Sequence, residues 1–270
     1  MAAIDLTRLG QQTEALIASY DEPQLFLARL HSLLRFYHRY SHRTQKSALP
    51  SSFLPSYDLP QQILPEVEAR LAPIARAKPK ETLALADFIW QDGNFEPKVL
   101  GAYILGQLGV EWSQQTLERL TQWFSTTTDR AATEALLQLG SQTVRRAAPD
   151  LWKEWIAGNL RSSIKAQCQA GLRALALWLP EAPSQFLPAI LDWVRPFLFQ
   201  PDTGLENELE AVFEALAIRT PQESAYLLKE ALAESHDSLL PARIRRYRVY
   251  FPAELANSLT QAVRTHQDAS

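Results

Sequence analysis

Residues 83–109, LALADFIWQDGNFEPKVLGAYILGQLG, decide the fold of this chain. Apolar residues recur at helical spacing on both sides of Gly93 and Asn94, and this pattern predicts two amphipathic helices joined by a Gly-Asn turn. A pair of helices with one apolar face each cannot bury those faces alone, so it must stack on neighbours of its own kind. The stretch therefore predicts one unit of a helical-repeat array.

The same spacing recurs along the rest of the chain, and no segment alternates in the manner of a β-strand. N-terminal helices are expected within residues 1–46, and the prolines and serines of residues 47–58 predict an extended loop. We therefore expect an all-α protein, a HEAT- or armadillo-like α-solenoid of antiparallel helical pairs, with stacked pairs over residues 59–266 in a single domain of residues 1–270. The helices predicted in the array span residues 79–92, 95–109, 112–125, 127–140, 149–158, 161–179, 183–199, 204–218, 221–235, 238–249 and 251–266.

The composition favours the same class. The chain has 17 Pro against 9 Gly, which is typical of helices that begin at proline and not of a sheet protein rich in glycine turns. Its hydrophobic content of 46% suffices for a continuous core. A formal net charge of -3 argues against a protein that is basic over its whole surface, although a local basic patch can still bind phosphates.

Cys168 is the single cysteine, so no disulfide or zinc ribbon can form within one chain. Small and apolar neighbours at helical spacing predict that its thiol is buried and structural. No segment has the ~20 apolar residues that span a bilayer, and the N-terminal residues lack the basic and apolar regions of a signal peptide. We therefore expect a cytoplasmic protein without a membrane partner.

Basic residues form two sets that are candidates for phosphate binding. In the first set, Arg35 and Arg39 are four residues apart and share a helix face, and Tyr37 and Tyr40 interleave with them. Such a face is typical of phosphate contacts with stacking support, and also of a solvated surface whose tyrosines belong to the core. The second set lies near the predicted turns of successive helical repeats. If these turns lie along one edge of the array, the basic side chains form a continuous binding surface for a long anion. The candidate nucleic-acid-binding residues are Arg35, Arg39, Arg43, Arg145, Arg146, Lys153 and Arg161.

Histidine and tryptophan residues give weaker indications of a metal site and of a ligand-binding surface. His31, His38 and His42 share a helical stripe whose spacing suits a metal, but the surrounding arginines repel a cation, so we expect no metal site and no cofactor. Most of the seven tryptophans follow the apolar faces of their helices. Trp123 and Trp152 are the two that we expect to be exposed and able to stack on a ligand.

A last arginine cluster follows a stretch rich in glutamate. We expect half of these arginines to form salt bridges between adjacent repeats, each exposed pair contributing at most about 1 kcal/mol, and not to contact a ligand. The cluster consists of Arg243, Arg245, Arg246 and Arg248.

Residues 85–108, LADFIWQDGNFEPKVLGAYILGQL, resemble the helix pair of the AlkD-type DNA alkylation repair family. The similarity extends weakly over about residues 60–200. It implies a HEAT-like solenoid that holds duplex DNA in a positively charged concave groove and, in active members, hydrolyses the glycosidic bond of alkylated purines. The matching positions are Ile89-Trp90, Phe95-Glu96 and Leu100-Gly101-Ala102.

The family resemblance also implies where catalysis would occur. Active members carry a Trp-Asp-x-x-Asp pattern in the next repeat, and its second carboxylate stabilises the developing sugar cation. Asp129 matches the first aspartate, but Thr128 stands in place of the tryptophan and Ala132 in place of the catalytic carboxylate. Glu134 lies roughly 200° further around the helix and cannot substitute. Because loss of one such electrostatic group costs factors of about 100 to 1000 in rate, Asp129 remains only a weak catalytic candidate.

These observations predict a non-catalytic or weakly catalytic HEAT-like binding module that holds duplex DNA through a basic concave face. One alternative is a protein–protein interaction scaffold that binds a protein or peptide, because the net charge is nearly neutral and the C-terminal repeats are acidic. A second alternative is an alkylpurine DNA glycosylase.

Overall fold

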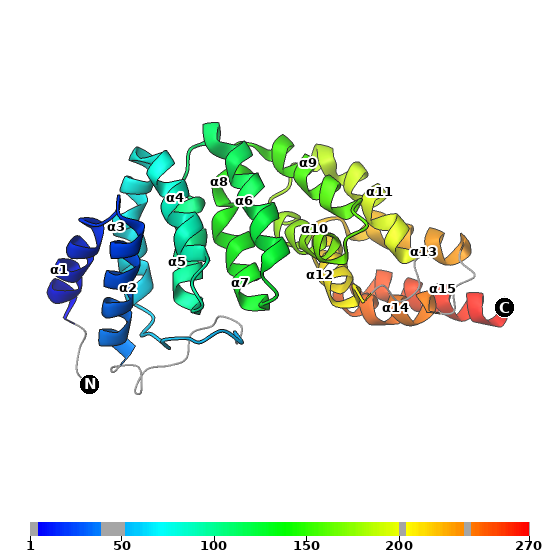
Figure 1. The fold of residues 1–270 in the computed structure, drawn as a ribbon. Helices are drawn as coiled ribbons and strands as arrows, with labels where there is room; N and C mark the ends of the chain where they lie inside the picture. The colour runs from blue at the N-terminus through cyan, green and yellow to red at the C-terminus, as the bar shows by residue number, and fades with distance from the viewer. Residues whose placement is uncertain (1–4, 39–51, 200–203, 235–238, 270) are drawn as a thin grey trace. The chain divides into compact units, whose positions relative to one another are not determined.

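The computed structural model describes residues 5–38, 52–199, 204–234 and 239–269 (Figure 1). These residues are mostly helical and none of them forms a β-strand, so the protein is all-α, as the hydrophobic spacing predicts. The chain divides into two compact units, residues 1–152 and 153–270, with the boundary inside helix α9. A single domain over the whole chain therefore stays a prediction.

The first unit contains α1 to α8 and the start of α9, and a π-helical turn, Leu136–Gly140, follows α7. The helices of this unit are α1 (Leu6–Ile17), α2 (Pro23–His38), α3 (Ile63–Ala77), α4 (Pro79–Trp90), α5 (Phe95–Leu105), α6 (Ser113–Thr126), α7 (Arg130–Ala135) and α8 (Gln142–Ala147), and α9 (Pro149–Leu160) continues from Lys153 in the second unit. Those of the second unit are α10 (Lys165–Trp178), α11 (Leu187–Leu198), α12 (Glu206–Arg219), α13 (Pro221–Glu234), α14 (Leu240–Tyr247) and α15 (Ala253–Ala269).

Several helices of the first unit contact the helix two places further along the chain, and some also contact the next helix. Helix α1 contacts α2 and α3, α2 contacts α4, α3 contacts α5, and α5 contacts α7 and the π-helical turn. Leu71, Leu85, Leu100 and Leu136 lie between these helices and have no exposed surface. The apolar spacing of the sequence therefore corresponds to the faces that the helices bury against one another.

Helix α5 is the buried centre of the first unit. Ten of its eleven residues, FEPKVLGAYIL, are buried, so neighbours cover it on all sides. Glycine permits close approach at its end, where a Cβ on Gly106 would lie 1.8 Å from the carbonyl oxygen of Leu139. Glu96 and Lys98, in the first turn, are buried together with the apolar residues. This end of α5 is therefore the polar part of an otherwise apolar core.

The second unit shows two series of contacts. Helices α10, α12 and α14 contact one another in order, and so do α11, α13 and α15, while contacts of α12 with α13 and of α14 with α15 join the series. Leu172, Phe213, Leu228 and Tyr247 are fully buried between them. The rings of Phe213 and Tyr247 stack with their centroids 4.6 Å apart, so α12 and α14 are joined through an aromatic pair.

The observed helices differ from the predicted ones in several places; the helix predicted over residues 95–109 ends at Leu105, and the helix predicted over residues 161–179 begins at Lys165. Helix α8 forms in a segment for which no helix was predicted, and the helix predicted over residues 127–140 starts at Arg130 because Asp129 caps it. The predicted loop of residues 47–58 is described from Ser52 onward and is non-helical there. In Figure 1 this segment runs along the lower ends of α5 and α7.

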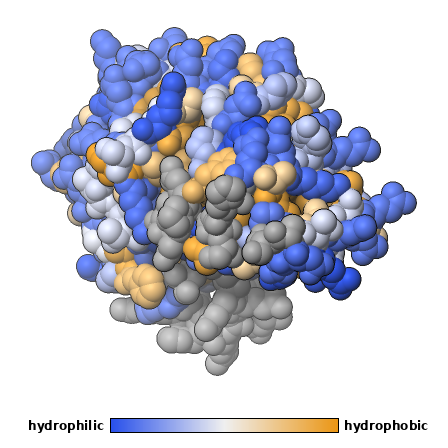
Figure 2. Space-filling model, turned by 90° about the vertical axis from the view of Figure 1, so that its right-hand side faces the viewer, coloured by the Kyte–Doolittle hydropathy of each residue, from blue (hydrophilic) through white to orange (hydrophobic). Residues whose placement is uncertain are grey.

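The surface is mixed in character. Figure 2 shows one face on which hydrophilic residues predominate and hydrophobic ones lie in small groups. Scattered apolar residues of this kind are normal on a folded protein. Among the helices of the described part, none combines the length and apolarity needed to cross a bilayer.

Candidate functional site

Asp129, the catalytic candidate, holds two parts of the first unit together. Its Oδ1 accepts the N–H of Ala132 at 2.8 Å and so caps α7. Its Oδ2 accepts the Ser52 hydroxyl at 2.9 Å and the Phe53 N–H at 2.8 Å. Burial raises the pKa of Asp129, but these hydrogen bonds outweigh it, so the pKa lies below its ordinary value. The carboxylate is therefore charged at neutral pH, with both oxygens engaged by the protein.

The neighbouring positions of the family pattern differ in environment. Ala132, which stands where the catalytic carboxylate would be, has no exposed surface. Thr128 is exposed, and Glu134 accepts a hydrogen bond from the side chain of Gln138 at 2.8 Å. Asp129 is the only one of the four positions at which a buried carboxylate occurs.

Glu96 is a second buried carboxylate that contacts the same segment. Its Oε1 accepts the Ser56 hydroxyl at 2.7 Å and the Tyr57 N–H at 2.8 Å. Its Oε2 is also buried and, among the described residues, accepts no hydrogen bond. Burial raises the pKa of Glu96 above its ordinary value, although the hydrogen bonds to Ser56 and Tyr57 oppose the shift.

Histidines of α2 hold the end of this segment. His31 lies between the Tyr57 hydroxyl, 2.8 Å from Nδ1, and the Asp92 carboxylate, 3.1 Å from Nε2. Nδ1 of His38 lies 2.5 Å from the Tyr57 carbonyl oxygen, while His42 falls outside the described residues. No three histidine, cysteine or carboxylate side chains in the described ranges are grouped to hold a metal.

The expected exposure of Trp123 and Trp152 is wrong. Trp123 is 3% exposed and stacks on Trp90 with centroids 4.6 Å apart and planes 7° apart. Trp152 has no exposed surface. Helical spacing shows which face of a helix is apolar but not how far the neighbouring helices cover it, and here they cover both indoles. Neither ring is available to stack on a base.

The predicted phosphate-binding residues have different environments. Arg35 and Arg146 are exposed, whereas Arg145 is buried, with 8% of its surface accessible. Lys153 places its ammonium 4.6 Å from the ring centroid of Phe186, a cation–π contact. Arg39 and Arg43 lie outside the described residues. The remaining candidate, Arg161, is exposed at the edge of a cavity in the second unit.

Four other arginines of the second unit, Arg173, Arg195, Arg243 and Arg246, pair with glutamates. Arg173 lies 2.7 Å from Glu208, and Arg243 lies 2.6 Å from Glu206. Within the last arginine cluster, Arg243 and Arg246 form ion pairs with glutamates of α12, whereas Arg245 and Arg248 bond to neutral side-chain oxygens. The prediction that half of this cluster forms salt bridges is confirmed.

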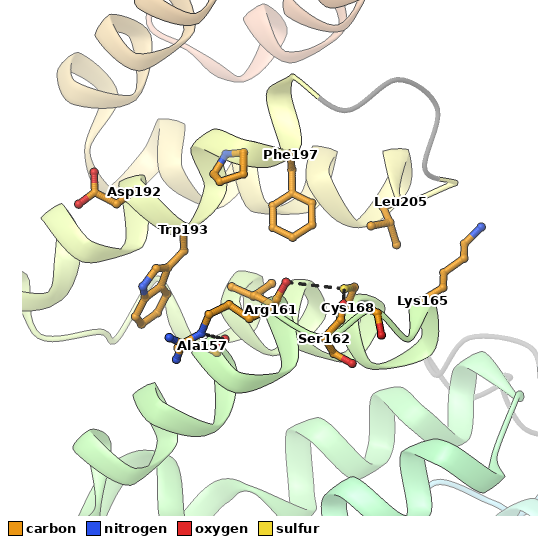
Figure 3. A pocket seen from close by; sticks show the side chains of 12 residues that line it. Ala157, Arg161, Ser162, Lys165, Cys168, Asp192, Trp193, Phe197 and Leu205 are labelled. Carbon is orange, nitrogen blue, oxygen red and sulfur yellow. Dashed lines mark hydrogen bonds between the residues drawn. The ribbon is translucent and has the colours of Figure 1, made fainter.

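The cavity in the second unit has a volume of about 710 Å³ and is bordered by the end of α9, the start of α10 and one face of α11. In Figure 3, Trp193 and Phe197 extend from α11 toward Arg161 and Cys168, and Lys165 lies at the opposite end from Trp193. Cys168 is buried, as its neighbours in the sequence predict, and burial raises the pKa of its thiol. The cavity thus combines aromatic walls with two cations, Arg161 and Lys165, and one carboxylate, Asp192.

Several of these residues were not identified from the sequence. From the sequence, Glu96 is identified only as one position of the family resemblance, Lys165 only as one of the basic residues near the predicted turns, and Lys98 and Trp193 are assigned no function. The charged pair in the apolar run FEPKVLGAYIL was a usable signal, because charged residues in a buried helix need partners. The cavity had no such signal, since its residues come from three helices.

Comparison with known proteins returns no match, whether with family models, curated proteins or solved structures. The AlkD-type resemblance therefore rests on the residues quoted above.

Proposed function

We propose that this chain is a HEAT-like helical-repeat module that binds nucleic acid, in particular duplex DNA, without releasing bases from it. The observation that carries the proposal is the pairing of charges in the second unit. Arg173, Arg195, Arg243 and Arg246 each have a glutamate partner. Arg161 and Lys165 border the cavity and, among the described residues, form no such ion pair, although the Asp192 carboxylate borders the cavity as well.

Two cations beside an aromatic wall suit a phosphate backbone. Arg161 donates from Nε to the carbonyl oxygen of Ala157 at 3.0 Å, which orients its guanidinium while leaving its other N–H groups for a ligand. Trp193, which is partly exposed, supplies a face on which a sugar or base can pack, whereas Phe197 is buried behind the cavity wall. Electrostatic attraction to phosphates dominates such binding, so a net charge of -3 does not oppose it where the local charge is positive.

The spacing of polar contacts supports a repeat of helical pairs within each unit. Arg119 pairs with Asp87 across 32 residues in the first unit, and Arg173 pairs with Glu208 across 35 residues in the second. Arg195 and Glu230 are again 35 residues apart. Such an offset is the one expected for contacts between equivalent helices of successive pairs, and it therefore supports the proposed helical repeat.

The proposal is tested by fluorescence anisotropy with a labelled duplex DNA at low and moderate salt. We expect binding that weakens steeply with salt, and Arg161→Gln/Lys165→Gln should weaken it about tenfold or more and reduce the slope of log K against log salt by about 2. A matched control, Arg195→Gln/Arg246→Gln, removes the same charge from ion-paired positions and should change binding far less. Absence of binding at low salt, or equal losses in both variants, contradicts the proposal.

The engagement of Asp129 supports binding without catalysis. Both of its oxygens accept hydrogen bonds from the protein, and Ala132 supplies no second carboxylate. A base-release assay on alkylated duplex DNA should therefore give the uncatalysed rate for the wild-type chain and for Asp129→Asn alike. Base release that depends on Asp129 would instead support the function of an alkylpurine DNA glycosylase.

A protein-interaction scaffold is the second candidate. The specific observation in its favour is the extended segment that the first unit holds through side-chain contacts to its backbone. This observation concerns a different surface from the cavity and leads to a separate inference.

A further inference from the structure

Residues 52–57, Ser-Phe-Leu-Pro-Ser-Tyr, contact the first unit as two similar dipeptides. In each, a serine donates its hydroxyl and the following aromatic residue donates its N–H to the same carboxylate oxygen. Ser52 and Phe53 bond to Oδ2 of Asp129, at 2.9 and 2.8 Å. Ser56 and Tyr57 bond to Oε1 of Glu96, at 2.7 and 2.8 Å. The two dipeptides, four residues apart in the segment, therefore bond to two different buried carboxylates in the same way.

The contacts between the two dipeptides and beyond them also involve backbone. The carbonyl oxygen of Pro55 accepts the N–H of Phe95 at 3.0 Å, and the Tyr57 carbonyl oxygen lies 2.5 Å from Nδ1 of His38. Recognition of this kind, through the main chain and a few side chains at fixed intervals, is the way in which proteins hold extended peptides. The Phe53 side chain is 95% exposed and takes little part.

The chain's own segment leaves the site incompletely satisfied. Glu96 is 4% exposed, yet its Oε2 accepts no hydrogen bond from any described residue. A buried carboxylate oxygen without a donor is unfavourable, so a ligand that brings one further donor gains an interaction that residues 52–57 do not make. An external segment with the same donors can therefore compete with the internal one, and a segment with one further donor to Oε2 would bind more tightly.

We propose that Asp129 and Glu96, together with His31, form a docking site for an extended segment of a partner protein with the pattern Ser-x-x-Pro-Ser-Tyr, and that the chain's own residues 52–57 fill this site in the structure. Each carboxylate selects serine followed by an N–H donor, and His31 selects the tyrosine hydroxyl, 2.8 Å from its Nδ1. The negative charge of the two carboxylates disfavours a nucleic acid at this surface. The inference does not depend on the nucleic-acid proposal for the second unit.

The test uses the full chain with its own segment weakened and a labelled peptide, Ser-Phe-Leu-Pro-Ser-Tyr-Asp, blocked at both ends. The release variant Ser52→Ala/Phe53→Pro/Ser56→Ala/Tyr57→Pro lacks the four donors to the carboxylates. It should bind one peptide per chain, at least about tenfold more tightly than the wild type, in which the tethered segment competes at a local concentration on the order of millimolar. Replacing both serines of the peptide by alanine should lower its affinity for the release variant by about tenfold or more.

Several results would overturn the inference. The inference is wrong if the folded release variant binds no peptide, or if it binds the alanine peptide as tightly as the original peptide. It is also wrong if the release variant binds duplex DNA more tightly than the wild type does. If the release variant does not fold, hydrogen exchange of the wild type with excess peptide decides instead. Displacement should accelerate exchange of the Phe53 and Tyr57 amides, and unchanged exchange at saturating peptide contradicts the docking site.

Discussion

Replacement of Gly106 by alanine tests the packing at the centre of the first unit. Gly106 follows α5 with φ -71° and ψ -8°, a conformation that alanine adopts without strain, so any effect is steric. An added Cβ would lie 1.8 Å from the Leu139 carbonyl oxygen and 2.9 Å from its carbonyl carbon. Both atoms belong to the backbone of the π-helical turn, and no side-chain rotation can relieve the contact.

The magnitude follows from this geometry. The two backbones must separate by roughly 1.5 Å to reach ordinary contact, and overpacking typically costs about 1–3 kcal/mol even where side chains adjust. We therefore expect Gly106→Ala to lose about 3 kcal/mol of unfolding free energy, which lowers the melting temperature by about 6–12 °C. Gly158→Ala is the matched control, because a Cβ there meets nothing within 4 Å, and a helical alanine in place of glycine stabilises by about 0.5–1 kcal/mol.

Urea unfolding followed by circular dichroism measures both variants against the wild type. If Gly106→Ala is as stable as the wild type, α5 does not approach the π-helical turn as described, and the buried position of α5 is wrong. Loss of stability in Gly158→Ala would instead show that the surroundings of α9 are more crowded than the structure indicates.

Three further variants test charged groups. Burial raises the pKa of Glu68 from 4.5 to about 7. Between these two pH values the folded state keeps a proton that the unfolded state has lost, so the free energy of unfolding falls as pH rises, by up to about 1.4 kcal/mol per pH unit. Glu68→Gln should remove that decline in urea unfolding between pH 5 and pH 8, and an unchanged slope refutes the assignment. Arg243→Ala should lower the free energy of unfolding by about 2 kcal/mol, because Arg243 is 7% exposed and its loss leaves a carboxylate without its partner. Arg195→Ala removes an ion pair at a more exposed position and should leave the melting temperature nearly unchanged. Equal losses of stability in the two variants would contradict this difference. Asp129→Ala should lose about 0.5–2 kcal/mol from the cap of α7 and accelerate amide exchange in residues 52–58, and unaltered exchange there would mean that this carboxylate does not hold the segment.

The helices were predictable because their signals are local. Apolar residues at helical spacing and breakers such as Pro79 and Pro149 place most helices within a few residues of their observed bounds. Helix α8 was missed because its six residues are too few to show a period. The burial of Trp123 and Trp152 was also missed, because exposure depends on neighbouring helices that the spacing of one helix does not reveal.

The candidate sites were harder to predict because they join segments that are distant in the sequence. Ser52 reaches Asp129 across 77 residues, and Ser56 reaches Glu96 across 40. Nothing in either segment alone indicates its partner. What the sequence did contain was the capping position of Asp129 and the charged residues in the apolar helix of Glu96, each of which needs hydrogen-bond donors from elsewhere in the fold.

Asp129 illustrates how one residue type serves different purposes at the same position of a pattern. In the Trp-Asp-x-x-Asp arrangement a carboxylate three residues after the first must face the ligand. Here position 132 is an alanine without exposed surface, and its N–H donates to Asp129. A carboxylate side chain at 132 would have to be buried among apolar residues, at a desolvation cost of several kcal/mol. The local structure that makes Asp129 a good helix cap therefore also places residue 132 in the core, so introducing an aspartate at position 132 would destabilise the first unit.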